Sequence, residues 1–161
     1  MRRLQKTIEE IGWTKTVPQL AHTDRVARAF ELMSREAHDC VLVVDERGLQ
    51  GIFTSRDFVN RVAAVRGNPH VLTLGGVMTS TPRTLRPRDG VAYAINWMAI
   101  EGFRNVPIVD EQGQVLGVLT VWDVMRHLDA VFLELEATPR PVRVQDEISG
   151  VVAMTDYGGG S

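Results

Sequence analysis

Two short motifs hold the residues of this chain that are best suited to binding or catalysis. Each reads Gly-apolar-apolar-Thr-x-x-Asp, with Thr54 and Asp57 in the first and Thr120 and Asp123 in the second. A carboxylate on the first turn of a helix can accept hydrogen bonds from both hydroxyls of a ribose, and the free N–H groups there favour a phosphate. The same spacing forms a capping box, in which the Thr and the acid satisfy those N–H groups. Both interpretations remain open for a single motif.

The rest of the chain gives catalysis no support. The sequence holds no Gly-x-Ser-x-Gly and no Walker-type phosphate loop. Its four histidines are scattered without a metal-ligand spacing, and its single cysteine, Cys40, stands in an apolar run typical of a buried side chain. Asp57 and Asp123 occupy equivalent places, which favours two binding roles over a catalytic pair. We therefore expect neither enzyme activity nor a metal site.

Composition and charge indicate an ordinary soluble globular protein. The chain has 161 residues, of which 44% are hydrophobic and 24% charged, with a formal net charge of -2. Nucleic acid is not expected as the main partner, because acids and bases are interspersed. The sequence holds no apolar run long enough to span a bilayer and no secretion signal. Since a lone cysteine suits a reducing compartment, a cytoplasmic location without membrane attachment is expected.

The two motifs recur because the chain repeats itself. A shift of 65 residues places Leu20 on Leu85 and the run 44–46 on the identical run 109–111. One extra residue near Val115 then changes the offset to 66, which brings the second motif onto the first. An internal repeat predicts two copies of one structural unit that bury their apolar faces against each other.

Each copy predicts a strand, a helix, two strands and a second helix. Asp24 and Asp89 stand where an N-cap or first-turn acid of the first helix belongs. The expected elements of the two copies, in order, are strands near 20 and at 84–85, helices at 24–35 and 89–100, strands at 41–44 and 106–109, strands at 51–53 and 115–119, and helices at 56–65 and 122–134.

The predicted organisation is a pair of copies sharing one core, because about 55 residues is marginal for an independent domain. The fold class is α/β (α+β), with two tandem β-α-β-β-α repeats packed sheet to sheet in pseudo-twofold symmetry. The tail offers further candidate strands at 142–144 or 151–154. The expected segments are an N-terminal extension at 1–12, the first repeat at 13–66, a linker at 67–74, the second repeat at 75–134 and a partly flexible tail at 135–161.

The two copies resemble the CBS repeat, whose signature is a strand ending Gly-apolar-x-Thr/Ser-x-x-Asp before the last helix. Residues 51–57 and 117–123 match it, and the runs 77–79 and 105–110 also look like this family. The resemblance covers roughly residues 13–132. It implies a Bateman module, a CBS pair with two clefts between the repeats, which commonly hold adenosine-bearing ligands such as AMP, ATP or S-adenosylmethionine.

In this family each cleft joins the Thr/Asp motif of one repeat to the first and middle strands of the other. The first cleft implied by the resemblance would hold Ile52, Thr54, Asp57, Thr84, Leu85, Arg104, Asn105, Val106 and Pro107. The second would hold Val118, Thr120, Asp123, Gln19, Leu20, Asp39, Cys40 and Val41. Ile52 and Val118 are suited to pack on an adenine face.

The two implied clefts differ in charge just before the middle strand, where nucleotide-binding relatives face the phosphates. The second copy offers Arg104 there and the first copy offers Asp39. Two unit charges about 4 Å apart interact by about 4 kcal/mol at a surface-like dielectric, before screening. We therefore expect the first cleft to take a phosphorylated ligand and the second to be empty or to hold something less anionic. A solvated surface role for Arg104 is the alternative.

The resemblance thus predicts a regulatory sensor that binds AMP, ADP, ATP or S-adenosylmethionine and alters the state of a partner. No cofactor is required. A homodimer, joined through the final helices of the repeats, and a separate effector protein are the expected partners. The alternative is a dimerisation or protein-docking module that works without a nucleotide.

Overall fold

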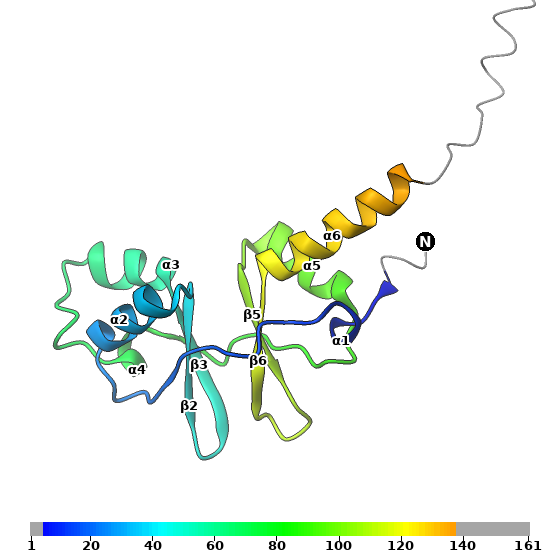
Figure 1. Cartoon of the computed structure of the whole chain (residues 1–161). Helices are drawn as coiled ribbons and strands as arrows, with labels where there is room; N and C mark the ends of the chain where they lie inside the picture. Colours follow the sequence, from blue (N-terminus) through cyan, green and yellow to red (C-terminus); the bar gives the residue numbers. More distant parts are fainter. Residues whose placement is uncertain (1–4, 138–161) are drawn as a thin grey trace, which may run out of the picture. The chain divides into compact units, whose positions relative to one another are not determined.

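The structure is a computed structural model, which describes residues 5–137 (Figure 1). The chain divides into two compact units between Asp129 and Ala130. The described part of the second unit is the end of the last helix. The candidate strands at 142–144 and 151–154 lie outside the described residues. Of the helices in the described part, none combines the length and the apolar character that crossing a membrane requires.

The first unit contains the two predicted copies, which confirms the fold class. The first copy consists of β1 (Gln19–Leu20), α2 (Val26–Glu36), β2 (Cys40–Asp45), β3 (Gly48–Thr54), α3 (Ser55–Phe58) and a π-helical turn, η2 (Val59–Ala63). The second consists of α5 (Val91–Glu101), β5 (Asn105–Val109), β6 (Val115–Thr120) and the beginning of α6 (Val121–Glu136). Three short elements, α1 (Ile8–Ile11), α4 (Leu74–Val77) and β4 (Thr79–Ser80), lie in the segments that lead into the copies.

The two sheets have the same strand order. In the first, β1 runs parallel to β2, while β2 and β3, and β3 and β4, are antiparallel. In the second, β5 pairs antiparallel with β6. Leu85 adds a parallel bridge to Ile108 on one side of this pair, and Thr14 adds an antiparallel bridge to Val118 on the other. Each sheet therefore takes one of its two outer strands or bridges, β4 or Thr14, from the segment that leads into the other copy.

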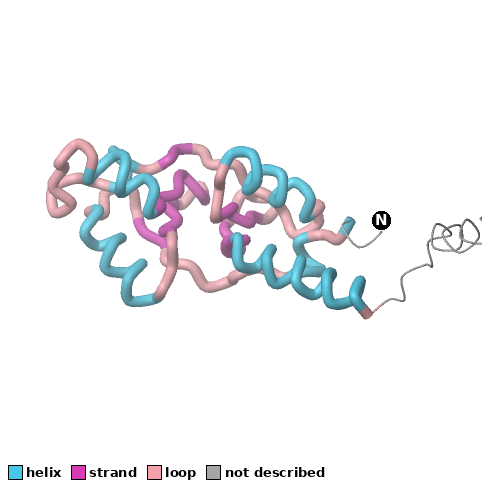
Figure 2. The backbone as a smooth tube through the Cα atoms, turned by 90° about the horizontal axis from the view of Figure 1, so that it is seen from above, coloured by secondary structure: helices cyan, strands magenta, loops and turns pink. Residues whose placement is uncertain are grey.

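Strand β2 is buried on both faces, which joins the two copies. Val41 and Val43 belong to the core of the first copy, whereas Cys40 and Leu42 belong to an apolar layer that includes Val118 of the second. This division follows from the alternation of side chains along a strand. In Figure 2 the strands of the first unit run through the middle and its helices lie outside.

The leading segments are exchanged between the copies. Ile8, at the start of α1, is fully buried in the core of the second copy, and its N–H donates to the carbonyl of Asp89 at 2.9 Å. Leu74, at the start of α4, is fully buried in the core of the first copy, and its N–H donates to the carbonyl of Asp24 at 2.9 Å. The segment expected as an N-terminal extension therefore packs into the second copy.

The prediction that Asp24 and Asp89 act at the first turn of their helices was wrong. Helices α2 and α5 begin two residues later, and neither has a side-chain cap. Asp24 Oδ2 accepts a hydrogen bond from the Ala21 N–H at 2.8 Å, and Asp89 Oδ2 accepts one from the Arg86 N–H at 2.7 Å. Both carboxylates close the turn that precedes the helix, because an Asp side chain bonds readily to nearby backbone N–H groups.

Candidate ligand-binding cleft

Thr54 and Asp57 form a capping box at the junction of β3 and α3. Asp57 Oδ2 accepts hydrogen bonds from the Thr54 N–H at 3.0 Å and from the Thr54 hydroxyl at 3.1 Å. The Asp57 N–H in turn donates to Thr54 Oγ1 at 3.3 Å. The capping interpretation of the motif is therefore realised, and it holds the Asp57 side chain in one orientation.

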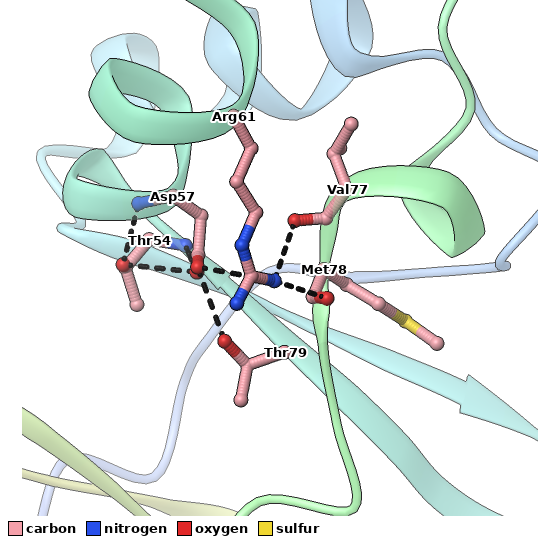
Figure 3. A network of polar contacts seen from close by, with 6 residues as sticks. All are labelled: Thr54, Asp57, Arg61, Val77, Met78 and Thr79. Atoms are coloured by element: carbon pink, nitrogen blue, oxygen red, sulfur yellow. Dashed lines mark hydrogen bonds and ion pairs between the residues drawn. The ribbon is translucent and has the colours of Figure 1, made fainter.

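The other carboxylate oxygen of Asp57 reaches the segment that leads into the second copy (Figure 3). Asp57 Oδ1 accepts a hydrogen bond from the Thr79 hydroxyl at 3.1 Å and lies 3.6 Å from the Arg61 guanidinium. Arg61 also donates to the carbonyls of Val77 at 3.1 Å and Met78 at 2.6 Å. Asp57, with only 7% of its surface exposed, therefore fastens the end of the first copy to the segment that leads into the second.

The second motif repeats this arrangement with the copies interchanged. Asp123 Oδ2 accepts hydrogen bonds from the N–H and the hydroxyl of Thr120, both at 2.8 Å, and from the Thr14 hydroxyl at 3.1 Å. Asp123 Oδ1 forms an ion pair with Arg126. We call the contacts of Asp57 with Thr79 and of Asp123 with Thr14 the two clasps.

Sequence reasoning did not assign Thr14 or Thr79 to a site. Thr79 ends the family-like run 77–79, but this run gave no link to Asp57, and Thr14 is 109 residues from Asp123. A signal was nevertheless present, because the 65-residue offset places Thr14 on Thr79. A hydroxyl that recurs at the same place in both copies indicates a shared role.

A cavity of about 410 Å³ lies beside the first clasp, between the two copies. This volume falls within the range of small-molecule sites. Its lining combines residues of the first motif with the start of β5: Asp39, Ile52, Thr54, Ser55, Arg56, Asp57, Val59, Asn60, Thr79, Pro82, Arg83, Gly102, Phe103, Arg104, Asn105, Val106 and Pro107. The structure thus brings together most of the side chains expected in the first cleft.

Two residues expected in that cleft, Thr84 and Leu85, are absent from its lining. Leu85 is buried in the core of the second copy, where it bridges to Ile108. Because the leading segment turns into the sheet at this point, the residues that it contributes to the cavity come earlier. They are Thr79, Pro82 and Arg83.

Asp39 was expected in the second cleft, but it lines the first, as Arg104 does. Asp39 Oδ1 accepts a hydrogen bond from the Ser55 hydroxyl at 2.5 Å, and Asp39 Oδ2 accepts one from the Asn105 side chain at 3.3 Å. The beginnings of β2 and β5 therefore lie together in one cleft. The prediction that Arg104 and Asp39 belong to different clefts was therefore wrong, because both line the same cavity.

Three arginines line the first cleft, and they differ in whether they already bind another group of the protein. Arg56 donates to the carbonyl of Gly102 at 3.0 Å, and Arg83 pairs with Glu101. Arg104 is exposed, and its guanidinium has no hydrogen bond or ion pair within residues 5–137. Among the described residues, Arg104 is thus the cation of this cleft that can meet an anionic group without first leaving a protein partner.

The residues expected in the second cleft are only partly gathered. Thr120 and Asp123 lie together, as described above. Leu20 and Val41 are buried in the core of the first copy, Val118 and Cys40 lie in the apolar layer between the sheets, and Gln19 is exposed on β1. Within the described residues, no group of three or more His, Cys, Asp and Glu side chains could hold a metal ion.

Burial raises the pKa of the Cys40 thiol to about 12, with a smaller contribution from the charge of Asp39. An unfolded thiol ionises near pH 8.5. Between these two values the unfolded chain loses a proton that the folded chain keeps, so stability must fall as the pH rises. The side chain therefore acts as a small apolar group of the layer.

We expect the unfolding free energy of the wild type to fall by about 2 kcal/mol more than that of Cys40→Ala between pH 8 and pH 10. Urea denaturation across this pH range measures both slopes. Comparing slopes removes the constant cost of the substitution and the titration of other groups. Parallel profiles would show that Cys40 ionises as easily in the folded chain as in the unfolded one.

A family model described as CBS domain matches the chain twice, over residues 14–64 and 74–130. Among its relatives, the meiotically up-regulated gene 70 protein of Schizosaccharomyces pombe is 35% identical over 97 residues, which make up 60% of this chain and 13% of that protein. The chain spans at most half the length of the first curated relatives that it matches, with shares of 13%, 19% and 50%.

Solved structures share the fold. The CBS domain protein PAE2072 from Pyrobaculum aerophilum, complexed with AMP, has a TM-score of 0.69 at 20% identity and covers 83% of this chain and 100% of its own. The CBS domain pair of protein MJ0100, in complex with 5′-methylthioadenosine and S-adenosyl-L-methionine, has a TM-score of 0.67 at 23% identity and covers 76% of this chain and 99% of its own.

Proposed function

Because this chain belongs to the CBS domain family and carries two copies of the domain, we propose that it is a regulatory module that binds an adenosine-containing ligand in its first cleft. The observation that carries the proposal is the meeting of Asp57, an apolar wall and Arg104, whose guanidinium has no partner among residues 5–137, around a cavity of about 410 Å³. The candidate ligands are AMP, ADP, ATP and S-adenosylmethionine. Structures of similar fold contain AMP in one case and S-adenosyl-L-methionine in another.

Each part of such a ligand has a suitable counterpart in the lining. The carboxylate of Asp57 suits the two hydroxyls of a ribose. Ile52, Val106 and Pro107 provide apolar surface for an adenine. The guanidinium of Arg104 suits a phosphate, for which its planar set of donors is well shaped.

Binding at Asp57 would couple the ligand to the arrangement of the two copies. Asp57 Oδ1 already accepts a hydrogen bond from Thr79, so ribose hydroxyls compete with the first clasp for the same oxygen. A ligand that prefers the loosened clasp shifts the population toward it, by no more than its differential affinity for the two states. We propose that a separate effector protein in the cytoplasm responds to this shift.

We also propose that the module works as a homodimer. Helices α5 and α6 leave large apolar side chains exposed in the first unit: Tyr93, Ile100, Trp122 and Met125. Several large apolar side chains exposed on two helices favour an interface. A second copy of the chain would cover it without a further partner.

A second candidate function is a docking module that needs no nucleotide. The observation that favours it is the occupancy of Asp57, whose two oxygens already face Thr54, Thr79 and Arg61. A carboxylate that is satisfied within the protein gains less from a ligand. Failure of every adenosine compound to bind, with a stable dimer in sedimentation, would favour this function.

We expect Arg104→Ala to weaken binding of the preferred phosphorylated ligand by about 10- to 100-fold, because it removes charge-assisted hydrogen bonds. Calorimetry with AMP, ADP, ATP and S-adenosylmethionine measures the change. Arg28→Ala, an exposed arginine of α2 outside the cleft, is the matched control and should bind normally. Equal affinities for the wild type and Arg104→Ala would contradict the phosphate role.

A further inference from the structure

The two clasps differ at the position three residues after the aspartate. In the first copy this position is Asn60, which lines the cavity beside Asp57. In the second copy the 66-residue offset places Arg126 there. Asn60 lies in η2 and Arg126 in α6, and each follows the aspartate of its motif by three residues.

Arg126 uses this position to bind the second aspartate. Its guanidinium forms an ion pair with Asp123 Oδ1, while Thr14 and Thr120 bind Oδ2. In the first copy the arginine that pairs with Asp57 is Arg61, one residue further along the helix. Arg61 is anchored to the carbonyls of Val77 and Met78 and is absent from the cavity lining.

We propose that Arg126 blocks the second cleft by occupying the carboxylate that a ribose would need. This proposal rests on the proposed function, since it concerns the same kind of ligand. A ligand entering the second cleft must break a charge-assisted ion pair before it gains a hydrogen bond to Asp123. In the first cleft Asn60 stands at this position, and Arg61, which lies 3.6 Å from Asp57 Oδ1, is outside the cavity lining, so the approach to Asp57 from the cavity is open. The module therefore binds one ligand per chain, and Arg126 determines which cleft it takes.

The exposed position of Arg126 makes it suitable for substitution. Its side chain is 74% exposed, whereas that of Asp123 is 5% exposed. Replacing Arg126 therefore leaves the core intact. The chain also supplies the matched exchange: Arg126→Asn gives the second cleft the residue of the first, and Asn60→Arg gives the first cleft the residue of the second.

Calorimetry with the adenosine compound that the wild type binds best tests the proposal through the stoichiometry. We expect one site per chain in the wild type and two in Arg126→Asn. The added site should disappear in the double variant Arg126→Asn/Asp123→Ala. Asn60→Arg should weaken the original site by about tenfold or more, the size of a competing charge-assisted contact.

The outcomes separate this proposal from the proposed function. Two sites in the wild type, or a single unchanged site in Arg126→Asn, would overturn the role of Arg126 and leave ligand binding intact. If Arg126→Asn binds the compound and the wild type does not, the blocking role of Arg126 is supported and the assignment of the ligand to the first cleft is overturned. If no variant binds any adenosine compound, both proposals fail.

Discussion

Replacing Ile8 with alanine is expected to lower the unfolding free energy by about 2–5 kcal/mol, the range for a large aliphatic side chain cut back inside a core. Ile8 lies before the first copy in the sequence, yet it is 0% exposed, in one cluster with Leu85, Val91 and Ile108 of the second copy. The truncation leaves a cavity that these neighbours can close only in part. Urea denaturation followed by circular dichroism measures the loss.

Val71→Ala is the matched control for this experiment. Val71 precedes α4, outside the two helices of the proposed dimer surface, and 63% of its surface is exposed. Its truncation should change the unfolding free energy by no more than about 0.5 kcal/mol. A similarly small effect of Ile8→Ala would mean that the leading segment is not part of the core, and it would contradict the exchange of segments.

The substitution Gly117→Ala should cost about 2–6 kcal/mol, combining backbone strain of about 1–3 kcal/mol with overpacking of about 1–3 kcal/mol. Gly117 has a φ of +139°, and a Cβ at this position would lie 2.3 Å from the carbonyl oxygen of Thr14. That oxygen accepts a hydrogen bond from the Val118 N–H at 2.8 Å. Because the hydroxyl of Thr14 also binds Asp123, the segment cannot withdraw without opening the second clasp.

Gly113→Ala separates the two contributions. Gly113 also has a positive φ, of +80°, but a Cβ there would have no neighbour within 4 Å. This control therefore measures the backbone strain alone, and thermal or urea denaturation of both variants gives the difference. Equal losses in the two variants would show that the Thr14 segment does not press against Gly117.

The sequence was sufficient for the features that depend on local pattern. The repeat placed the strands of both copies, and the Thr-x-x-Asp spacing predicted the capping box that Thr54 and Asp57 form. The continuous apolar run in β2 likewise indicated a strand, and such a run is the pattern of a strand that is buried on both faces. These features are set by residues close together in the chain, so a periodic pattern is enough to find them.

The remaining features depend on contacts between distant segments. The clasp of Thr14 with Asp123 joins residues 109 apart, and the side chain of Asn105 meets Asp39 across 66 residues. No local pattern reports such a meeting. The position of Asp39 in particular follows from how the two sheets face each other, since this brings the beginnings of β2 and β5 into one cleft.

The exchange of leading segments bears on how such a chain can have arisen. Ile8, which precedes the first copy, fills the core of the second, and Leu74, which precedes the second copy, fills the core of the first. In an ancestor with a single copy, the leading segment would therefore not have packed into the core of its own molecule. Such a chain could complete its fold only by trading segments with an identical molecule, as swapped dimers do. Gene duplication would then have joined an assembly that already existed, and turned a bond between two molecules into one within a single polypeptide.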